Sequence, residues 1–517
     1  MITIINKRKN GYIQIERQVH DMLLTELLER QKNNGTVAIK YGNRVISYQE
    51  WYDESNRLSF VLNENSHKDS LNIGVFLPNS IGYAVAYYAI LFNEKIAVPI
   101  DVRSKPLEIL SLAQYCEMDV VLTTIQYREL LENSFLKYGH KITLIFIEDY
   151  SSKVVNNEKD YIKKTKYIVP HGDENDVAIM LHTSGTTNNP KRVMLTHRNL
   201  ITNVEANIES LQLSMNDKVL ICMPMAFGYC NTAQFLTHLY LGASMVISEG
   251  IFVPRIFFQI VQEEKITNFT GVPSMLLMLL EYGDSSKYDM TSLRYICFGG
   301  GKMPVELLNK LVKKFRAVGF VQTYGQTEAS PRITALLPKD AIRKIGSVGL
   351  PLPNIKLKVV DENGSTLASN KIGEIIIQGS GVMKGYYKQP KITASTIIDG
   401  WLHTGDLGYV DEEGYLYLTG RMKNVIISGG MNIYPEEIEE ILMAHSNIRE
   451  VCVVPEESKI LGEVPVAKIV EVNDGDRINY RAFCIDKLAN YKIPVRFDIV
   501  DALDKTYNGK IKRSGRK

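Results

Sequence analysis

Short apolar runs alternate with longer segments that carry one apolar face near the start of the chain. The strand-like runs lie at 71–77, 97–100 and 119–123, and the segments between them lie at 83–92 and 107–116. Short runs of Val, Ile and Leu bounded by Pro, Asn or Gly are typical of buried strands, and the longer segments are typical of helices. This strand–helix order predicts a parallel sheet with helices on its faces.

The alternation resumes after a Lys- and Asn-rich connection at 150–176. Val177–Leu181 predicts a buried strand, and Thr196 predicts the N-cap of an amphipathic helix that follows Lys191. The apolar stripe of that helix contains Leu200, Val204, Ile208 and Leu211. More strands and helices follow from 218 to 320, so we expect a second parallel-sheet unit.

The pattern changes after residue 345. Short strands at 356–360, 374–378, 409–410 and 415–418 are separated by Gly, Pro and Asp, which predicts an antiparallel barrel or sandwich. Beyond Gly420, a helix starting at Pro435, a strand at 451–454 and a helix at 480–488 predict a small α+β unit. The predicted fold class is therefore α/β, with a boundary near Gly420-Arg421 between a large and a small domain.

Composition narrows the class of protein only slightly. Of 517 residues, 45% are hydrophobic and 23% are charged, and the net charge of +2 gives no reason to expect nucleic acid as a partner. We expect no signal peptide and no membrane-spanning segment, because no apolar run is long enough. The six Cys lack CxxC spacing, which favours free thiols in the cytoplasm over disulfides or a zinc site.

One loop is unusually rich in hydroxyl groups. Its residues are Thr183, Ser184, Gly185, Thr186 and Thr187, and Lys191 follows. Many donors with one mobile positive charge suit a polyphosphate, and the alternative is a polar turn between a strand and a helix. A Walker A loop is excluded, because Pro190 precedes Lys191 and Arg192 follows it.

Five motifs occur in a fixed order along the chain. They are Thr183–Lys191, Tyr324–Glu328, Trp401–Asp406, Gly420-Arg421 and Asn508–Lys510. Together they resemble the adenylate-forming superfamily of acyl-CoA synthetases, peptide-synthetase adenylation domains and firefly-type luciferases, and they are most similar to acyl-CoA ligases. The resemblance covers the chain from Ile46 to Lys510. It implies a large domain at 1–420 with two parallel-sheet subdomains and an antiparallel barrel, a hinge at 421–424, and a small mobile domain at 425–517.

The resemblance also implies a role for each motif. The hydroxyl loop and Lys191 would close over the β- and γ-phosphates of ATP, and Asp406 with Arg421 would hold the ribose. Glu328 would bind Mg²⁺, and Thr327 would lie near the α-phosphate and the substrate carboxylate. Lys510 would bridge those two groups and neutralise developing charge. The adenine would meet Gly299, Gly300, Gly301 and the ring of Tyr324. Thr323 and Gly325 would also bind the nucleotide.

Several residues keep a structural alternative. Asp406 is also compatible with a turn, Glu328 with a helix cap, and Lys510 with a solvated basic tail. His182, His197 and His403 are interpreted as structural, because no Asp or Glu is spaced to pair with them. The related families have Gly where this chain has Asn188 and Arg192. Asn tolerates left-handed backbone, and Arg192 either reaches phosphate or lies in solvent.

The second half-reaction implied by the resemblance transfers the acyl group to a thiol. Lys423 stands at the hinge position, and Gly429 with Gly430 would line a channel for pantetheine; the alternative for the glycines is a plain turn between a strand and a helix. The expected acceptor is CoA. A phosphopantetheinyl carrier protein and a catalytically weak nucleotide-binding relative remain as alternatives.

The expected pocket sequence limits which carboxylic acid the protein could activate. Residues 224–231 contain no Asp or Glu to pair with an ammonium group, which disfavours an α-amino acid. The pocket candidates Phe227, Tyr229, Phe298 and Gly299 favour an apolar acyl or aryl acid, and the length of its chain stays open.

Overall fold

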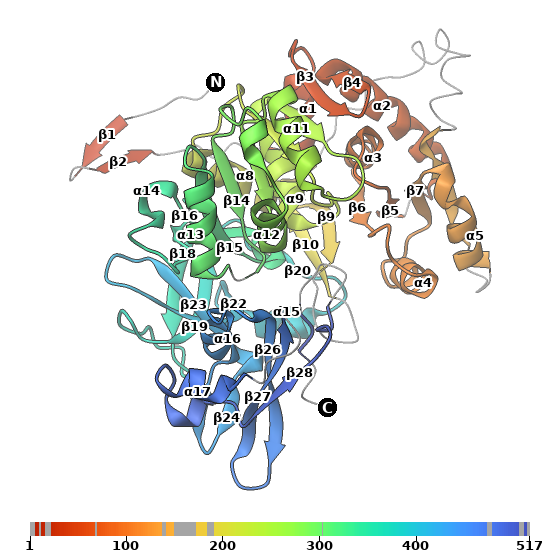
Figure 1. Ribbon diagram of the computed structural model, residues 1–517. Helices are drawn as coiled ribbons and strands as arrows, with labels where there is room; N and C mark the ends of the chain where they lie inside the picture. The colour runs from red at the N-terminus through yellow and green to blue at the C-terminus, as the bar shows by residue number, and fades with distance from the viewer. Residues whose placement is uncertain are drawn as a thin grey trace.

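The computed structural model describes residues 22–67, 70–136, 141–148, 172–182, 191–301, 303–472, 478–505 and 511–513. It also describes the backbone of a small hairpin, β1 (Asn6–Lys9) and β2 (Tyr12–Ile15). Figure 1 shows the N-terminal elements at the top of the molecule and the last strands, β24 to β28, at the bottom.

The first sheet is mostly parallel. Its strands lie in the order β20 (Gly385–Tyr386), β10 (Arg192–Thr196), β9 (Val177–His182), β6 (Ile96–Pro99), β5 (Asn72–Phe76), β7 (Val120–Thr123) and β8 (Thr143–Phe146). The connecting helices are α3 (Ile81–Phe92), α4 (Pro106–Tyr115) and α5 (Arg128–Leu136). This arrangement confirms the parallel sheet predicted from the strand–helix alternation.

The second sheet is parallel in its middle and antiparallel at both ends. Its order is β17 (Leu350–Pro351), β16 (Arg332–Leu336), β15 (Gly319–Gly325), β14 (Tyr295–Phe298), β13 (Asn268–Gly271), β11 (Lys218–Ile221), β12 (Ser244–Ile247), β3 (Val37–Tyr41) and β4 (Arg44–Ser47). Helix α3 contacts β3 of this sheet as well as β5 and β6 of the first sheet. Because it packs against both sheets, α3 is apolar and buried nearly all round.

Helices precede, connect and follow these strands. They are α1 (Leu24–Gln31), α2 (Tyr48–Asn65), α8 (His197–Leu211), α9 (Gly228–Cys230), α10 (Thr237–Leu241), α11 (Pro254–Glu264), α12 (Pro273–Glu281), α13 (Val305–Lys314) and α14 (Pro338–Ala341). Between α9 and α10 the chain forms a π-helical segment, η2 (Asn231–Leu236). None of the helices in the described part of the chain is long and apolar enough to cross a bilayer.

The helix expected directly after Lys191 begins later than predicted. Strand β10 comes first and pairs antiparallel with β9, so that Arg192 lies opposite His182. Helix α8 then starts at His197, and the Thr196 hydroxyl accepts a hydrogen bond of 3.1 Å from the Asn199 amide, as an N-cap should. The hydroxyl-rich segment therefore connects two paired strands, and the interpretation as a turn between a strand and a helix is wrong.

The third sheet is antiparallel and forms an open half-barrel. Its strands are β18 (Lys356–Val360), β19 (Gly373–Gln378), β22 (Trp401–Val410) and β21 (Ile397–Ile398), and β23 (Leu416–Arg421) also pairs with β22. Helix α15 (Pro390–Thr396) leads into β21. Strands β18 and β19 lie where the sequence predicted them, whereas β22 is much longer than the predicted run 409–410 and β21 was not predicted.

The last sheet has its own hydrophobic core. Its strands are β25 (Met431–Ile433), β24 (Ile426–Ser428), β27 (Gly462–Glu471) and β26 (Ile448–Ser458), with β28 (Arg496–Ile499) beside β27. Helices α16 (Pro435–Met443) and α17 (Tyr480–Ile485) pack on it. The core includes Ile426, Ile438, Leu442 and Ile469, so this unit buries its apolar residues largely against one another.

Candidate active site

Three residues predicted to bind the nucleotide meet where β15 approaches the half-barrel. The Tyr324 hydroxyl donates a hydrogen bond of 2.8 Å to one oxygen of Asp406, and the Arg421 Nε lies 2.8 Å from the other. Asp406 and Arg421 are also paired across β22 and β23. Asp406 is only 5% exposed and lies within β22, so the alternative that it is a turn residue is wrong.

The chemistry of this first cluster suits hydroxyl groups. A carboxylate has about four lone-pair sites, so it can accept hydrogen bonds from a ligand as well as from the protein. Burial and the neighbouring Asp406 raise the pKa of Tyr324 well above its ordinary value, so its hydroxyl stays protonated at neutral pH.

A second cluster surrounds Glu328. This residue lies in a short 3-10 turn, η4 (Thr327–Ala329), and one of its carboxylate oxygens accepts a hydrogen bond of 2.9 Å from the Tyr386 hydroxyl. The Lys191 ammonium lies 4.6 Å from the centre of the Tyr386 ring. Tyr386 thus connects two residues singled out in the sequence, although the sequence analysis did not include Tyr386 itself.

Glu328 is suitable for holding a magnesium ion together with phosphate oxygens. Mg²⁺ is usually bound through one or two carboxylates plus phosphate oxygens and water. Tyr386 engages one oxygen of Glu328, which fixes the carboxylate and leaves the other oxygen without a hydrogen bond from the described residues. The described residues contain no group of three or more His, Cys, Asp or Glu that could form an all-protein metal cage.

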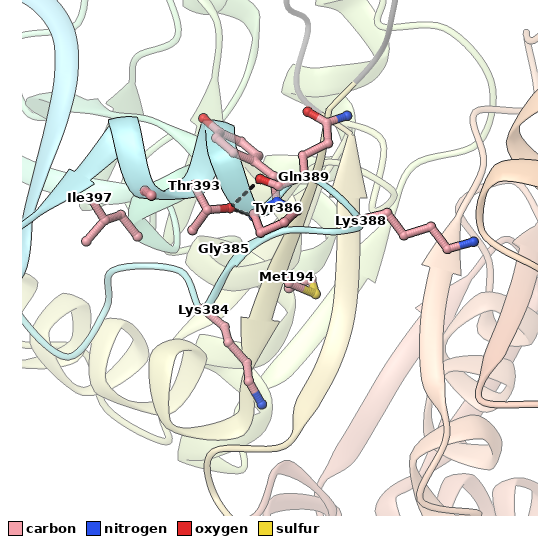
Figure 2. A pocket seen from close by; sticks show the side chains of 10 residues that line it. Met194, Lys384, Gly385, Tyr386, Lys388, Gln389, Thr393 and Ile397 are labelled. Carbon is pink, nitrogen blue, oxygen red and sulfur yellow. Dashed lines mark hydrogen bonds between the residues drawn. The ribbon is translucent and has the colours of Figure 1, made fainter.

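A surface pocket lies beside this second cluster (Figure 2). Met194, Pro390 and Ile397 contribute its apolar lining, and Lys384 and Lys388 supply positive charge. The Tyr386 amide donates to the Thr393 hydroxyl at 2.9 Å and so ties β20 to α15. Of the predicted nucleotide-binding residues that the structure describes, none lines this pocket.

Thr323 and Gly299 are in close contact at the ends of β15 and β14. The Thr323 hydroxyl donates to the Phe298 carbonyl at 3.1 Å and shares a hydrogen bond of 2.7 Å with the Tyr229 hydroxyl. A Cβ on Gly299 would lie 2.6 Å from the carbonyl oxygen of Thr323. Gly299 is therefore required by packing within the protein, a reason that the sequence analysis did not identify; Gly300 and Gly301 follow it in the same loop.

The adjoining residues have packing roles of their own. A Cβ on Gly325 would lie 1.8 Å from the Pro331 carbonyl oxygen, so only glycine fits there. A Cβ on Gly228 would lie 3.8 Å from the Thr327 methyl group, which places Thr327 beside the start of α9. Of the pocket candidates, Phe298 is 1% exposed and belongs to the main core, whereas Tyr229 is partly buried and faces Thr323.

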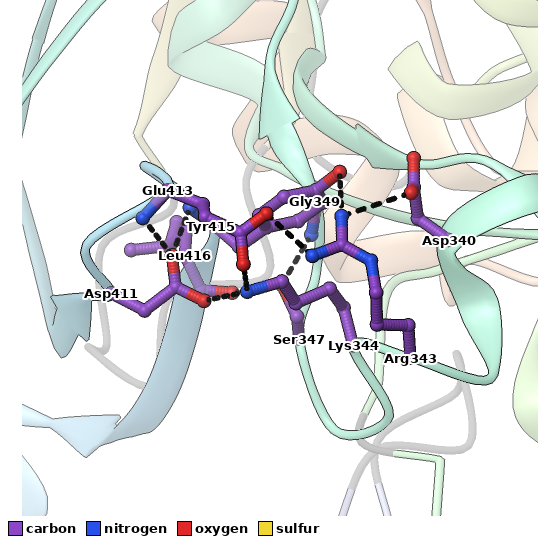
Figure 3. A network of polar contacts seen from close by, with 9 residues as sticks. All are labelled: Asp340, Arg343, Lys344, Ser347, Gly349, Asp411, Glu413, Tyr415 and Leu416. Atoms are coloured by element: carbon purple, nitrogen blue, oxygen red, sulfur yellow. Dashed lines mark hydrogen bonds and ion pairs between the residues drawn. The ribbon is translucent and has the colours of Figure 1, made fainter.

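A polar network holds the turn between β22 and β23, the strands that carry Asp406 and Arg421 (Figure 3). The Lys344 ammonium lies 2.6 Å from a carboxylate oxygen of Asp411 and 2.6 Å from one of Glu413. Arg343 bridges Glu413 and Asp340. The network connects the half-barrel to the segment that follows α14, and so fixes the first cluster relative to the second sheet.

The hinge candidate Lys423 lies near both clusters. It is an exposed residue in a 3-10 turn, η5 (Met422–Asn424), between β23 and β24. Desolvation and then the charges of Arg421 and Lys191 lower its pKa, while Asp406 acts in the opposite direction. The hinge therefore lies within electrostatic reach of residues from both clusters.

Gly429 and Gly430 form the two-residue turn of the hairpin β24–β25. Their φ angles are +56° and +81°, which fits a turn that requires two left-handed residues. The Gly429 amide donates to the Leu461 carbonyl at 2.8 Å. The turn joins two strands, and α16 begins only at Pro435, so the alternative of a turn between a strand and a helix is wrong.

Two expectations about other polar residues need correction. Arg192 is 4% exposed, so the alternative that it lies in solvent is wrong. His403 does have an acidic partner, because its Nδ1 lies 2.7 Å from Glu374. Burial lowers the pKa of His182 and of His197 to about 4, which keeps both neutral and agrees with a structural role.

Some predicted site residues lie outside the described part of the chain. They are Thr183, Ser184, Gly185, Thr186, Thr187, Asn188 and Lys510. Their roles therefore stay predictions.

Comparison with known proteins identifies the family. Residues 28–387 match the family model described as AMP-binding enzyme, and residues 437–510 match the model of the AMP-binding enzyme C-terminal domain. The chain belongs to the AMP-binding enzyme family.

Individual proteins resemble the chain over most of its length. A long-chain-fatty-acid–CoA ligase of Bacillus subtilis (strain 168) is 31% identical over 512 residues, covering 92% of this chain and 90% of that protein. The o-succinylbenzoate CoA synthetase (MenE) of Bacillus subtilis, in complex with the acyl-adenylate intermediate OSB-AMP, has a TM-score of 0.84 at 26% identity and covers 95% of this chain and 97% of its own. The same enzyme in complex with ATP and magnesium ion has a TM-score of 0.83 at 26% identity and covers 95% of this chain and 98% of its own.

Proposed function

We propose that this chain is an ATP-dependent acid–thiol ligase of the acyl-CoA synthetase type. It activates a carboxylic acid as acyl-AMP with release of pyrophosphate and then transfers the acyl group to CoA. The observation that carries the proposal is the convergence of Tyr324, Asp406 and Arg421 from separate parts of the chain. The similar enzyme solved with ATP and magnesium supports the same cofactors here.

The first cluster binds the nucleoside. Asp406 accepts hydrogen bonds from the two ribose hydroxyls, and Arg421 and Tyr324 hold its carboxylate in place. The ring of Tyr324, with Thr323, Gly325 and the loop at 299–301, forms the adenine site.

We assign the phosphates to the second cluster, the hydroxyl-rich loop and Lys510. Glu328 holds Mg²⁺, which neutralises phosphate charge when it is bound. Lys191 and the hydroxyl loop bind the β- and γ-phosphates, and Thr327 and Lys510 orient the substrate carboxylate against the α-phosphorus. An oxygen of that carboxylate attacks the α-phosphorus as the bond to the bridging oxygen of pyrophosphate breaks. No protein base is needed, because the acid is already ionised at neutral pH.

Thioester formation requires a second arrangement of the chain. We propose that residues 425–517 form a mobile domain that rotates about residues 421–424, with Lys423 as the pivot, relative to a domain of residues 1–420. Gly429 and Gly430 then line the path of the pantetheine arm, where side chains would obstruct it. The proposal places the enzyme in the cytoplasm, a reducing compartment that suits its six free cysteines.

Pyrophosphate release tests this function directly. The purified chain is supplied with ATP, Mg²⁺ and a panel of fatty and aryl acids, with and without CoA. Acid-dependent pyrophosphate and a CoA thioester are expected, and Lys510→Ala should abolish the first step. Release of pyrophosphate without a CoA thioester would favour a carrier protein as acceptor, and no release with any acid would refute the ligase function.

A further inference from the structure

Arg332 is a charged side chain buried beside the proposed acyl site. It begins β16, is 2% exposed, and is among the largest fully buried side chains of the described residues. Its guanidinium lies 5.6 Å from the centre of the Tyr229 ring, and the Tyr229 hydroxyl contacts Thr323. Thr323 in turn packs against Gly299. Arg332 therefore lies directly behind one of the pocket candidates, Tyr229.

The guanidinium is only partly satisfied by the protein. Its Nη1 donates to the side-chain oxygen of Asn207 on α8. Its Nε and Nη2 are buried and make no hydrogen bond of good geometry to any described residue, although the Tyr229 hydroxyl and the Cys297 thiol lie close enough to interact with the guanidinium. The other groups that face it are the uncharged Cys297 and Tyr229, and no Asp or Glu of the described residues pairs with it.

An unpaired buried charge is costly, so the arrangement requires an explanation. Burying an ionised side chain without a partner of opposite charge destabilises the folded protein by several kcal/mol, on the order of the effective desolvation penalty. Arginine remains protonated in proteins and cannot avoid this cost by losing its proton. A partner that arrives with the substrate would remove the penalty.

The geometry of the free nitrogens specifies the chemistry of that partner. Nε and Nη2 form one edge of the planar guanidinium, and two parallel N–H groups on such an edge match the two oxygens of a carboxylate. Asn207 holds Nη1 and so orients the free edge; the same asparagine also donates at 3.0 Å to the hydroxyl of Thr237 on α10. Because Asn207 belongs to α8 and is hydrogen-bonded to α10, the orientation of the guanidinium edge is fixed by the fold.

The backbone around the site is also irregular. The π-helical segment η2 starts two residues after Tyr229, and Asn231, Thr232 and Gln234 within it are fully buried polar residues. Both polar side-chain atoms of Asn231 are buried without a hydrogen-bond partner among the described residues. Segments of π-helix occur frequently at functional sites.

We propose that Arg332 recognises a second carboxylate on the acid, so that the preferred substrate is a dicarboxylic acid. One carboxylate is activated on the nucleotide side, and the other forms a bidentate pair with Arg332 beyond Tyr229. The body between the two carboxylates is an apolar acyl or aryl unit. This inference rests on the proposed ligase function and names the substrate class for that site.

The test compares matched acids with the full-length wild-type enzyme. Pairs such as octanoate with octanedioate, dodecanoate with dodecanedioate, and phenylpropanoate with its carboxyphenyl analogue differ only in the second carboxylate. For the best pair, we expect kcat/KM for pyrophosphate release to favour the diacid by at least about 100-fold, because a site built for a polar group rejects ligands that lack it. A wild-type preference for the monoacids would overturn the proposal and leave the ligase function intact.

Two variants separate recognition from a structural role. Arg332→Met should lower kcat/KM for the diacid by at least about 100-fold and keep that for the monoacid within about threefold, with KM for ATP unchanged. Arg332→Lys keeps the charge without the bidentate edge and should give an intermediate loss. Equal losses for both acids would overturn the proposal.

The controls exclude the remaining ambiguities. Arg30→Met removes an arginine whose side chain is 53% exposed on α1 and should leave kcat/KM unchanged for both acids. Should Arg332→Met fail to fold, the wild-type preference and Arg332→Lys decide the outcome. Absence of pyrophosphate release with every acid would refute the ligase function itself, a result distinct from release with monoacids alone.

Discussion

Tyr386 is a single residue whose two ends contact two different site residues. Its hydroxyl donates to Glu328, and its ring lies under the Lys191 ammonium. Burial and then the Glu328 charge raise the pKa of Tyr386, so the hydroxyl stays protonated and remains a donor over the whole working range of pH. Tyr386 is therefore in a position to orient the proposed magnesium ligand.

Removing the Tyr386 hydroxyl should slow adenylation. In Tyr386→Phe the ring and its contact with Lys191 are kept, but the hydrogen bond to the carboxylate is lost. We expect kcat for ATP–pyrophosphate exchange to fall about tenfold or more, the usual effect of losing a hydrogen bond to a charged group. The Mg²⁺ concentration needed for half-maximal rate should rise. The neighbouring Tyr387→Phe, whose hydroxyl donates to Glu117 at 3.1 Å, is the matched control. Equal rates in the two variants would contradict the role.

His238 shows how a buried residue makes stability depend on pH. Its Nδ1 lies 2.7 Å from the Gln234 carbonyl and its Nε2 lies 3.0 Å from the Asn268 amide nitrogen. These contacts fit a neutral ring that donates from Nδ1 and accepts at Nε2. Burial lowers the pKa of His238 from about 6.5 to about 4.

The sign of the pH effect follows from that lowered pKa. Above pH 6.5 neither the folded nor the unfolded chain binds the proton, and the stabilisation is complete. Between pH 6.5 and 4 only the unfolded chain binds it, so the free energy of unfolding decreases as the pH is lowered. From pH 7 to pH 5 the contribution of His238 should amount to about 2 kcal/mol. Urea unfolding at both pH values should show this loss in wild type and less of it in His238→Gln. The exposed His67→Gln should behave as wild type, and an unchanged pH dependence in His238→Gln would refute the assignment.

At the scale of whole elements, the β22–β23 hairpin depends on Lys344. The Lys344 side chain is 11% exposed and contacts Asp411 and Glu413, whereas the adjacent Arg343 side chain is 51% exposed. Hydrogen bonds to both acids raise the pKa of Lys344, which stays charged at neutral pH. Substitutions of Lys344 and Arg343 therefore compare a buried with an exposed cation in the same network of ion pairs.

Replacing Lys344 should affect stability more than replacing Arg343. Lys344→Met leaves two carboxylates at the hairpin without their shared cation and should lower the thermal unfolding midpoint by roughly 2–5 °C. Arg343→Met removes an exposed pair and should shift the midpoint by about 1 °C or less. Differential scanning calorimetry at low salt measures both shifts. A larger effect for Arg343→Met would show that burial does not decide the contribution of these ion pairs.

Elements with a strong local signal were predictable from the sequence. Strand β18 lies where the run 356–360 predicted it, and Thr196 caps α8 as expected. Strand β10 was missed because Lys191 and Arg192 were assigned to the loop, and only pairing with β9 shows that 192–196 is a strand. Strand β20 has two residues and no hydrophobic period, so nothing local indicated that Tyr386 would reach Glu328.

Contacts between distant segments were the least predictable part of the site. The family resemblance assigned Tyr324, Asp406 and Arg421 to one nucleotide site, and the structure brings the three side chains into contact, while their roles stay predictions. The pair His403–Glu374 was missed because its members are adjacent only across β19 and β22. Arg332 was missed because an arginine at the start of a strand gives no sign of burial, which depends here on α8, α9 and β14 together.

For the molecule as a whole, the proposed rotation predicts that the two half-reactions can be separated. Proline fixes φ near −65° and removes a backbone donor. In Lys423→Pro the turn η5 is restricted, and we expect one arrangement of the domains to persist. ATP–pyrophosphate exchange should then continue, while thioester formation from added acyl-AMP and CoA should fall by at least about 100-fold, as expected when reacting groups are misplaced.

Lys423→Ala distinguishes this effect from loss of the lysine charge near Lys191 and Arg421. The alanine variant keeps the backbone free to rotate, so its thioester formation should stay well above that of the proline variant. Because the added acyl-AMP bypasses the first step, a defect in adenylation cannot imitate a defect in transfer. If exchange and transfer decline in proportion in Lys423→Pro, rotation at 421–424 is not what separates the two steps, and the pivot must lie elsewhere in the chain.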